Sequence, residues 1–340
     1  MTYEETMAEI EAGLTGDPKH DIKYLKEQCD KYKDSENGRE IVRACGRLMA
    51  KALPEDAMAE INKALNKDFS KFEKKLNEVK KCQIEKNFGK ALELLEPLIK
   101  DMEGMESNGL YADDSVSEYY CFDDPMEEVL YAHFNNCQKE LRHCDIPYAT
   151  AYMQYGSLLI DLDRWDDAQK ALKKALEWNP SSTHIIFELG ETYKHANELD
   201  LYFKTIIDAF KYCYEPHSLA RAYRNIGYYF IEKELYDEAI AAYFMSYHFE
   251  QSELVQNELM YINKISGKEI VQPSIDDMKK VADKYGFTIG AHEDVLGIAF
   301  AIGKDAMGNG KSGNETAKYF FSIVYNLTGD DDIKQLIDKL

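Results

Sequence analysis

A glycine flanked by large apolar residues recurs three times in the middle of the chain. Gly156 is followed by Gly190 after 34 residues and by Gly227 after a further 37. A second set of residues follows each glycine at offsets of 12, 16 and 19 positions. These residues are Ala168, Leu172 and Ala175; Tyr202, Ile206 and Ala209; and Ala239, Tyr243 and Ser246. Recurrence at this period indicates a supersecondary unit that is repeated along the chain.

Each copy reads as two amphipathic helices folded back on one another. A glycine on the first helix lets the two helices approach closely, and Ala168 is small on the second helix for the same contact. The apolar residues four and seven positions further on continue that stripe at helical spacing. Pro180 ends the second helix of the first copy. Because one hairpin cannot bury its apolar faces alone, we expect successive hairpins to stack.

The segments GSLLIDLDRWDDAQKALKKALEWNP, FELGETY and NIGYYFIEKELYDEAIAAYFMSY resemble the tetratricopeptide repeat (TPR) family, most closely over residues 149–253. Tyr202 departs from the family pattern, which has a small residue there, and three extra residues around CYEPHS lengthen one connection. The resemblance implies an all-α fold, a right-handed α-solenoid of antiparallel helix pairs; an irregular helical bundle is the alternative. The residues expected to pack the repeats are Gly156, Ala168, Ala175, Pro180, Gly190, Ala209, Gly227 and Ala239.

Fainter helical patterns flank the three copies and suggest four segments. They are residues 1–66, with short helices at 3–13, 19–33, 38–51 and 54–65; residues 67–148, with a degenerate repeat at 68–105 and an acidic-aromatic insert at 106–124; residues 149–253, with the three repeats; and residues 254–340, with capping helices. A helix is also expected from the cap Asp124 through residue 143, and another after the cap Ser274. We expect the insert to be a packed connector, with an interaction loop for basic groups as the alternative.

The charge balance favours some partners over others. The chain carries 62 acidic and 41 basic residues, a net charge of −21. Such a surface repels phosphate backbones and anionic lipid, so we expect neither nucleic-acid nor membrane binding. Thr2 and Glu5 predict a helix cap where a signal peptide would begin, and no run of 18 apolar residues occurs. Seven scattered cysteines without a C-x-x-C motif are typical of reduced thiols, which favours a cytoplasmic protein.

No residue pattern supports catalysis, and we expect no catalytic, cofactor-binding or metal-binding residues. Gly310-Lys311-Ser312 matches the end of a phosphate-binding loop, but Asp305 stands where that loop needs glycine and the preceding VLGIAFAIGK reads as a helix. His133 and Cys137 lie one helical turn apart, which alone is a weak metal signal that core or surface packing also explains.

The TPR resemblance implies a ligand groove lined by the first helix of each pair. The residues predicted to line it are Met153, Ser157, Ile160, His184, Phe187, Glu191, Lys194, His195, Arg221, Arg224, Tyr228 and Ile231. The chaperone-binding clamp of the family is not reproduced, because Met153 and Ser157 replace its Lys and Asn. A positive spot of Lys194, Arg221 and Arg224 beside apolar side chains suits a peptide with a carboxylate next to a hydrophobic group. Alternatively, the arginines pair with Glu191 and Glu232.

These features predict a non-enzymatic scaffold that binds a protein or peptide on the concave face of a TPR-like superhelix. A peptide-responsive regulatory sensor, as in bacterial pheromone receptors with TPR folds, is one alternative. A self-assembling structural component is another, since the 24 tyrosines favour interfaces. An enzyme with an unrecognised site is the third. The sequence leaves the partner, the pathway and the oligomeric state open.

Overall fold

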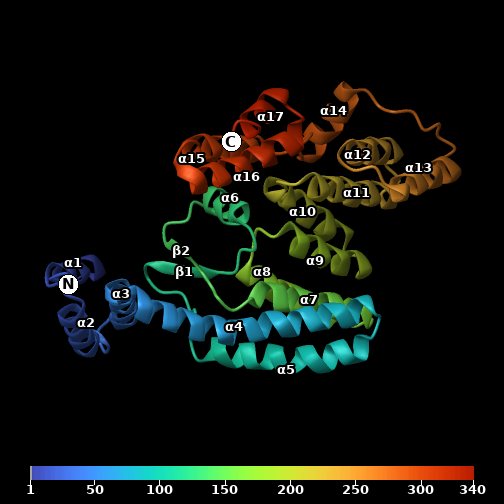
Figure 1. The fold of residues 1–340 in the computed structure, drawn as a ribbon. Helices are drawn as coiled ribbons and strands as arrows, with labels where there is room; N and C mark the ends of the chain where they lie inside the picture. The colour runs from blue at the N-terminus through green and yellow to red at the C-terminus, as the bar shows by residue number, and fades with distance from the viewer. Residues whose placement is uncertain (1) are drawn as a thin grey trace. The chain divides into compact units, whose positions relative to one another are not determined.

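Nearly all regular structure in the chain is helical. The computed structural model describes the backbone of residues 2–340 and the side chains of all of these except 55, 56 and 58–69. Within this described part the backbone forms 17 α-helices, one 3₁₀ turn and two four-residue strands, so the predicted all-α class is confirmed (Figure 1). Two compact units are present: unit 1 comprises residues 1–121 and 137–154, and unit 2 comprises residues 122–136 and 155–340.

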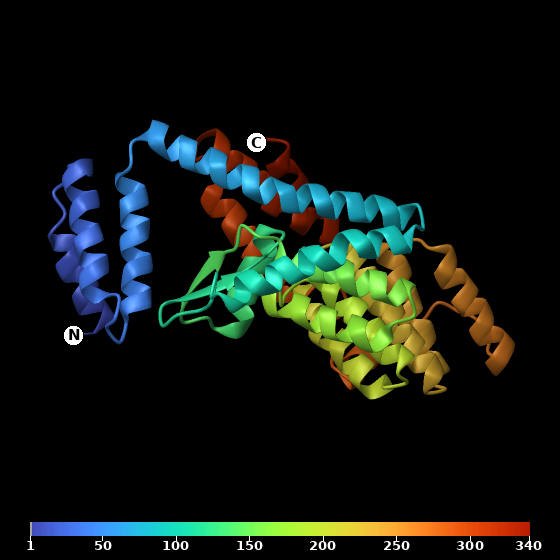
Figure 2. The same ribbon diagram turned by 90° about the horizontal axis from the view of Figure 1, so that it is seen from below.

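Unit 1 begins with three short helices that enclose a small core (Figure 2). The predicted cap is confirmed: the Thr2 hydroxyl accepts from the Glu5 backbone N–H at 3.2 Å, and the Glu5 carboxylate accepts from the Thr2 backbone at 3.0 Å. The apolar stripes of the three helices meet at Met7, Leu25 and Ile41, which are buried. These helices are α1 (Tyr3–Ala12), α2 (Pro18–Tyr32) and α3 (Gly38–Ala52), close to the predicted spans.

Two long helices follow and lie antiparallel, side by side (Figures 1 and 2). They are α4 (Glu55–Ile84) and α5 (Phe88–Ser107). The sequence pattern predicts separate helices at 54–65 and from residue 68, and this prediction is wrong: α4 is continuous. The physical reason is that the segment LNKDFSKF contains neither glycine nor proline, so nothing in it breaks the backbone hydrogen-bond ladder.

Unit 1 also contains a pair of parallel strands. Strand β1 (Ser117–Tyr120) comes from the acidic-aromatic insert and pairs with β2 (Glu140–His143), with Ser117 opposite Glu140. The predicted helix through residue 143 is therefore wrong in its last part. Helix α6 (Pro125–Asn135), which belongs to unit 2, begins at the expected cap Asp124 and ends where Asn136 adopts a left-handed conformation with φ 48°.

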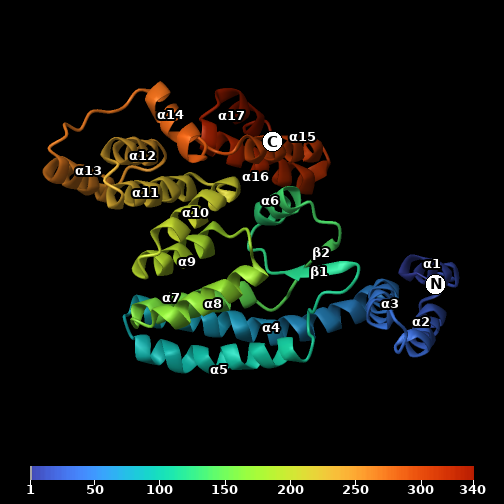
Figure 3. The ribbon, with the colours of Figure 1, turned by 180° about the vertical axis from the view of Figure 1, so that it is seen from behind.

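Unit 2 is built mainly from consecutive helix pairs (Figure 3). Neighbouring pairs also contact each other, because α8 packs on α9, α10 on α11 and α12 on α13. Helix α7 contributes its residues up to Gln154 to unit 1 and the rest to unit 2. The elements are α7 (Tyr148–Asp161), α8 (Trp165–Trp178), α9 (Thr183–His195), α10 (Leu199–Ala209), the 3₁₀ turn η1 (Phe210–Tyr212), α11 (Pro216–Glu232), α12 (Tyr236–Phe249) and α13 (Glu253–Ser266).

The last helices of unit 2 match the predicted capping segment in their spans. Helix α14 (Ile275–Tyr285) begins after the predicted cap Ser274, whose hydroxyl accepts from the Asp277 backbone at 3.2 Å. Helices α15 (Glu293–Ala306) and α16 (Gly310–Thr328) form the predicted terminal pair, followed by α17 (Asp331–Ile337). Among the described residues, no helix combines the length and apolar character needed to cross a lipid bilayer.

Candidate functional site

The recurring glycines lie where the first helix of a pair meets the second. A Cβ added at Gly156 would lie 2.5 Å from Cγ of Leu172, and one added at Gly227 would lie 2.8 Å from the ring of Tyr243. Real Cβ atoms essentially never approach so closely, so any side chain here would push the helices apart. In both pairs the contacted residue stands 16 positions after the glycine.

Gly190 makes the same contact with more room. A Cβ added there would lie 3.2 Å from Cδ1 of Ile206, which is again 16 positions later, and 3.5 Å from the ring of Tyr202. Tyr202 replaces the small residue of the family pattern, and it is fully buried. Its hydroxyl donates to the carbonyl of Asn225 at 3.2 Å. Burial in this position raises the pKa of Tyr202 well above its usual value, so the phenol stays a neutral donor.

Each pair closes with the same turn seven positions after its glycine. Asp163, Asn197 and Glu234 adopt left-handed φ angles of 59°, 58° and 58°. In the third pair, the Glu234 N–H donates to the Ile231 carbonyl at 2.9 Å, and the next N–H, of Leu235, donates to Phe230 at 2.8 Å. The other two turns repeat these two bonds. This is the Schellman arrangement that satisfies the last carbonyls of a helix.

The other residues predicted to pack the repeats lie inside or at the ends of these pairs. The four alanines are buried: Ala168, Ala175, Ala209 and Ala239. Pro180 follows Trp178, the last residue of α8, and is half-buried.

The predicted ligand-groove residues divide by exposure. Phe187 and Ile231 are only 1% and 7% exposed, so we correct their assignment: they are core side chains covered by neighbouring helices. His184 and His195 are exposed. Met153 lies on the part of α7 that belongs to unit 1. The remaining residues are half-buried and offer part of their side chains to solvent: Ser157, Ile160, Glu191, Lys194, Arg221, Arg224 and Tyr228. We call this half-buried set the first-helix face.

The cations of the first-helix face are held by carboxylates. Arg221 donates through Nη2 to Glu188 at 2.8 Å and lies over the ring of Phe187, 5.2 Å from its centroid. Arg224 donates through Nη1 to Glu250 at 2.7 Å. Both arginines are therefore paired with carboxylates, as the alternative predicted. The partners it named, Glu191 and Glu232, are wrong.

Lys194 completes the charged part of this face. Its Nζ lies 2.6 Å from a carboxylate oxygen of Glu191 and 4.6 Å from the ring centroid of Tyr228. The predicted positive spot is thus a set of ion pairs beside an aromatic ring. Because the pairs are part-exposed, each contributes about 1 kcal/mol or less to stability, and their main effect is to fix the side chains in place.

Glu250 lies between two side chains, Arg224 and His217. Burial alone would raise its pKa, but the hydrogen bonds from Arg224 at 2.7 Å and His217 at 3.1 Å hold that pKa below its usual value. Glu250 therefore stays ionised and anchors Arg224 at neutral pH. Beside it lies a cavity of about 590 Å³ with an acidic and aromatic wall. Its lining residues are Asp124, Tyr214, Glu215, Pro216, His217, Phe249, Glu250, Tyr319, Ser322, Ile323 and Asn326.

Three residues that contact the predicted groove residues were not predicted from the sequence. The indole of Trp165 stacks on the His195 ring with centroids 3.9 Å apart and an interplanar angle of 7°. Glu188 and Glu250 provide the carboxylates for the arginines. Acidic residues are so frequent in this chain that no local signal distinguishes Glu188 and Glu250. Trp165, in contrast, stands close to the turn residue Asp163 and could have been predicted from the sequence.

Of the residues considered for chemistry, Gly310-Lys311-Ser312 lies in α16 and His133 lies in α6. Gly310-Lys311-Ser312 forms the first turn of α16, and α15 rather than a strand precedes it. His133 Nε2 lies 3.3 Å from a carboxylate oxygen of Asp294. In the part of the chain that the structure describes, no three His, Cys, Asp or Glu side chains gather as a metal site would require.

No protein-family model matches the chain. No curated protein matches it either.

Proposed function

We propose that the helix pairs from α7 to α12 form a TPR-like solenoid, and that its first-helix face binds a peptide or protein segment without catalysing a reaction. The observation that carries the proposal is the threefold repeat of one local geometry: a glycine contact at an offset of 16 and a left-handed turn at an offset of 7. Identical hairpins stacked in sequence present equivalent side chains at regular intervals. A regular row of this kind is suited to an extended or helical segment.

The first-helix face has the chemistry for a peptide that carries a carboxylate. A guanidinium has five N–H donors in a rigid fork. Arg221 uses Nη2 for Glu188, and Arg224 uses Nη1 for Glu250, so donors remain on both. The ion pairs hold the forks in place before a ligand arrives, which lowers the entropy lost on binding. Tyr228 and Ile160 add partly exposed apolar surface. We expect micromolar affinity, about −8 kcal/mol.

Charge reversal tests this face directly. We expect the double variant Arg221→Glu, Arg224→Glu to lose the peptides that the wild-type chain selects from a phage-displayed random library, because four units of charge change where the carboxylate would bind. The control variant Lys170→Glu, Lys204→Glu makes the same charge change on exposed residues of the second helices α8 and α10. It should select and retain the same peptides.

Folding is checked on both variants by circular dichroism. Retention of the selected peptides by a folded Arg221→Glu, Arg224→Glu variant would show that the first-helix face is not the binding surface. Loss of binding by both variants would show a dependence on overall charge alone, which also contradicts the proposal.

A second candidate function, self-association, is favoured by a different surface. Eleven large apolar side chains are exposed among the described residues, and six of them lie between 254 and 275. Ile275 is 76% exposed. These six belong to α13, to the extended segment after it and to the start of α14: Leu254, Met260, Tyr261, Ile265, Val271 and Ile275. Concentrated apolar exposure marks an interaction site, and a second copy of the chain is the proposed occupant.

Sedimentation velocity separates this candidate from peptide binding. We expect the wild-type chain to show a dimer whose fraction rises with concentration, and the variant Met260→Ser, Ile275→Asp to remain monomeric. A wild-type chain that is monomeric at all concentrations would remove the candidate. Peptide selection by the first-helix face should be the same in both chains.

A further inference from the structure

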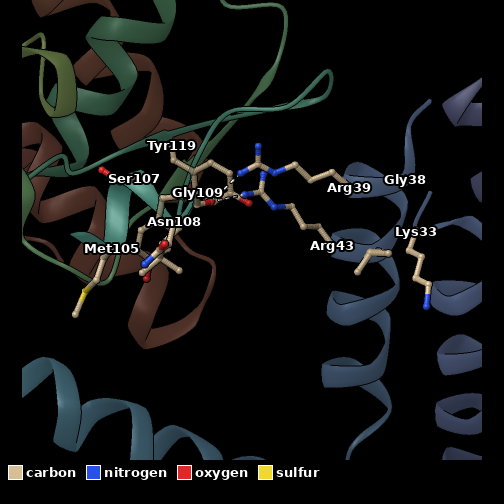
Figure 4. A pocket seen from close by; sticks show the side chains of 12 residues that line it. Lys33, Gly38, Arg39, Arg43, Met105, Ser107, Asn108, Gly109 and Tyr119 are labelled. Atoms are coloured by element: carbon tan, nitrogen blue, oxygen red, sulfur yellow. Dashed lines mark hydrogen bonds between the residues drawn. The ribbon is translucent and has the colours of Figure 1, made fainter. Parts of the chain in front are cut away.

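Unit 1 contains a cavity whose lining reverses the charge balance of the chain. The cavity has a volume of about 1,020 Å³ and lies between α3 and residues 105–119 (Figure 4). Three cationic side chains line it and no carboxylate does, although acids outnumber bases 62 to 41 in the whole chain. The lining residues are Lys33, Gly38, Arg39, Val42, Arg43, Met105, Ser107, Asn108, Gly109, Leu110, Tyr111 and Tyr119.

Helix periodicity places the arginines. Arg39 and Arg43 are four residues apart on α3 and therefore share one face. The opposite face of α3 is apolar, and its Ile41 and Cys45 are buried against α1 and α2. Burial of the apolar face thus directs both guanidinium groups toward the loop after α5, as Figure 4 shows.

The two arginines are held differently. Arg43 donates through Nη1 to Asp114 at 2.9 Å and to the Ala112 carbonyl at 2.6 Å, so its charge is paired. Arg39 donates through Nη2 to the Gly109 carbonyl at 2.7 Å and has no carboxylate partner among the described residues. Its remaining N–H groups are without a protein acceptor there. A cation without a carboxylate partner at the edge of a cavity favours an anionic ligand.

The far wall is aromatic. The rings of Tyr111 and Tyr119 lie with centroids 5.6 Å apart, and Arg43 lies 5.2 Å from the centroid of Tyr119. The chain reaches this wall through two left-handed residues, Gly109 with φ 78° and Tyr111 with φ 56°. A non-glycine residue held in this conformation stores strain, and such residues concentrate at ligand sites. The Tyr111 hydroxyl donates to Asp145 at 3.3 Å, which fixes the ring.

A neighbouring cavity is a weaker candidate for an anion. It has a volume of about 560 Å³ and shares Arg43, Tyr111 and Tyr119. However, Glu140 and Asp145 also line it. Their carboxylates oppose an anion there, although Arg43, Arg47 and Arg142 line the same cavity, whereas the larger cavity is lined by no carboxylate.

We propose that the larger cavity binds a small organic anion, namely a phosphate or carboxylate group carried on an aromatic body. Arg39 and Lys33 would hold the anionic group, with Arg43 at its side, and Tyr111 and Tyr119 would contact the aromatic body. The volume is close to that of pockets that enclose small molecules. This site is independent of the proposed peptide-binding face, because all its residues belong to unit 1.

Calorimetric titration of the full chain with four probes tests both parts of the ligand. Phenyl phosphate and benzoate each carry one of the two anionic groups on a phenyl ring. Inorganic phosphate lacks the ring, and phenol lacks the anionic group. We expect saturable binding of at least one of the first two probes. Whichever of the two binds more tightly identifies the anionic group. Inorganic phosphate and phenol should each bind about tenfold more weakly or not at all, since each loses one of the two contacts.

Variants assign the binding to the cavity. Arg39→Gln removes the charge but keeps an N–H donor for the Gly109 carbonyl, and we expect it to weaken binding about tenfold or more. Lys33→Gln should weaken binding less, because Lys33 already has a carboxylate partner, Asp30, at 3.3 Å. Lys23→Gln is the matched control on α2, the helix that ends just before Lys33; it lies outside the cavity lining and should bind as the wild type does.

Three results would overturn the proposal. In the first, neither aromatic anion shows saturable binding at millimolar concentration. In the second, phenol binds as tightly as phenyl phosphate or benzoate. In the third, Arg39→Gln keeps the wild-type affinity and the wild-type circular dichroism spectrum. Equal affinity for phenyl phosphate and inorganic phosphate would overturn the aromatic part.

Discussion

The helix pair α4/α5 of unit 1 and the pair α11/α12 of unit 2 close with the same turn but pack differently. Lys86 of the first pair and Glu234 of the second adopt left-handed φ angles of 56° and 58°. In the first pair the N–H of Lys86 donates to Gln83 at 2.9 Å and that of Asn87 to Cys82 at 2.8 Å, which repeats the bonding of the Glu234 turn.

The difference lies seven positions before the turn. Gly227 stands there in α11, and Val79 stands there in α4. Val79 is fully buried, and so is Leu95, which follows it by the same offset of 16 that joins Gly227 to Tyr243. The same turn therefore closes both hairpins, and we infer that the residue at this position sets how near the two helices come. The degenerate repeat predicted at 68–105 has the turn but carries Val79 in place of the glycine.

The largest expected effect comes from giving α11 the residue of α4. Gly227→Val places a branched side chain against the Tyr243 ring, where a Cβ alone would be 2.8 Å away, and should cost about 3 kcal/mol or more of stability. Urea unfolding followed by tryptophan fluorescence measures it, because both tryptophans, Trp165 and Trp178, lie in unit 2. Gly190→Ala is the control and should be nearly neutral. An undiminished unfolding midpoint for Gly227→Val would show that the glycine is not needed for close packing of α11 on α12.

The reverse exchange should also destabilise. Val79→Gly removes a buried side chain, leaves a cavity and lowers helix propensity, for a loss of about 2 to 3 kcal/mol. Circular dichroism at 222 nm during urea unfolding measures it. Lys80→Gly, at an exposed position of α4, isolates the propensity part, about 1 kcal/mol. Equal losses in the two variants would mean that Val79 packs against nothing specific.

The shared turn predicts a smaller effect of the opposite sign. Glu234→Gly and Lys86→Gly should each stabilise the chain by about 0.5 to 1 kcal/mol, because glycine adopts positive φ without the clash that other residues suffer. Thermal unfolding of each single variant measures the gain. Destabilisation by either one would show that the two turns are not equivalent.

The smallest expected effect is a difference in pH dependence between the units. Hydrogen bonds, first from the Thr15 backbone, lower the pKa of Asp21 in unit 1 to about 2. Burial raises the pKa of Glu127 in unit 2, although Asn179 donates to it at 2.7 Å. The contribution of Asp21 is present above its ordinary pKa and is lost as pH falls toward 2. The contribution of Glu127 to stability is present at acid pH and is lost as pH rises through its raised pKa.

Urea midpoints measured across pH 2–8 for the variants Asp21→Asn and Glu127→Gln check these signs. The difference in urea midpoint between Asp21→Asn and the wild type should shrink toward acid pH. The difference in urea midpoint between Glu127→Gln and the wild type should instead shrink as pH rises above the ordinary pKa of glutamate. Parallel slopes in the two variants would contradict the assignment.

The spans of the helices were predictable where local chemistry decides them. The spacing of Gly156, Gly190 and Gly227 carries a steric reason and needed no distant partner. The strand Glu140–His143 was not predictable, because ELRH has no strand preference of its own and is extended only by pairing with residues 117–120. Tertiary pairing overrides local propensity there.

The acid partners of the predicted groove arginines could not be found from the sequence. Offsets from the glycines located Arg221 and Arg224, yet their partners lie 33 and 26 residues away along the chain, where periodicity carries no information. The same limit hid the cavity of unit 1. Arg39 and Arg43 have visible helical spacing, but the loop that completes the wall follows about 70 residues later.

A double-mutant cycle on Gly156 and Leu172 tests most directly whether close helix approach at the recurring glycine defines these pairs. We expect Gly156→Ala to cost about 1 to 3 kcal/mol in the wild-type chain and much less in Leu172→Ala, because that change removes the atoms 2.5 to 3.3 Å from the new Cβ. The coupling energy from urea unfolding would then exceed about 1 kcal/mol. Additive effects, with a coupling below about 0.5 kcal/mol, would contradict the account.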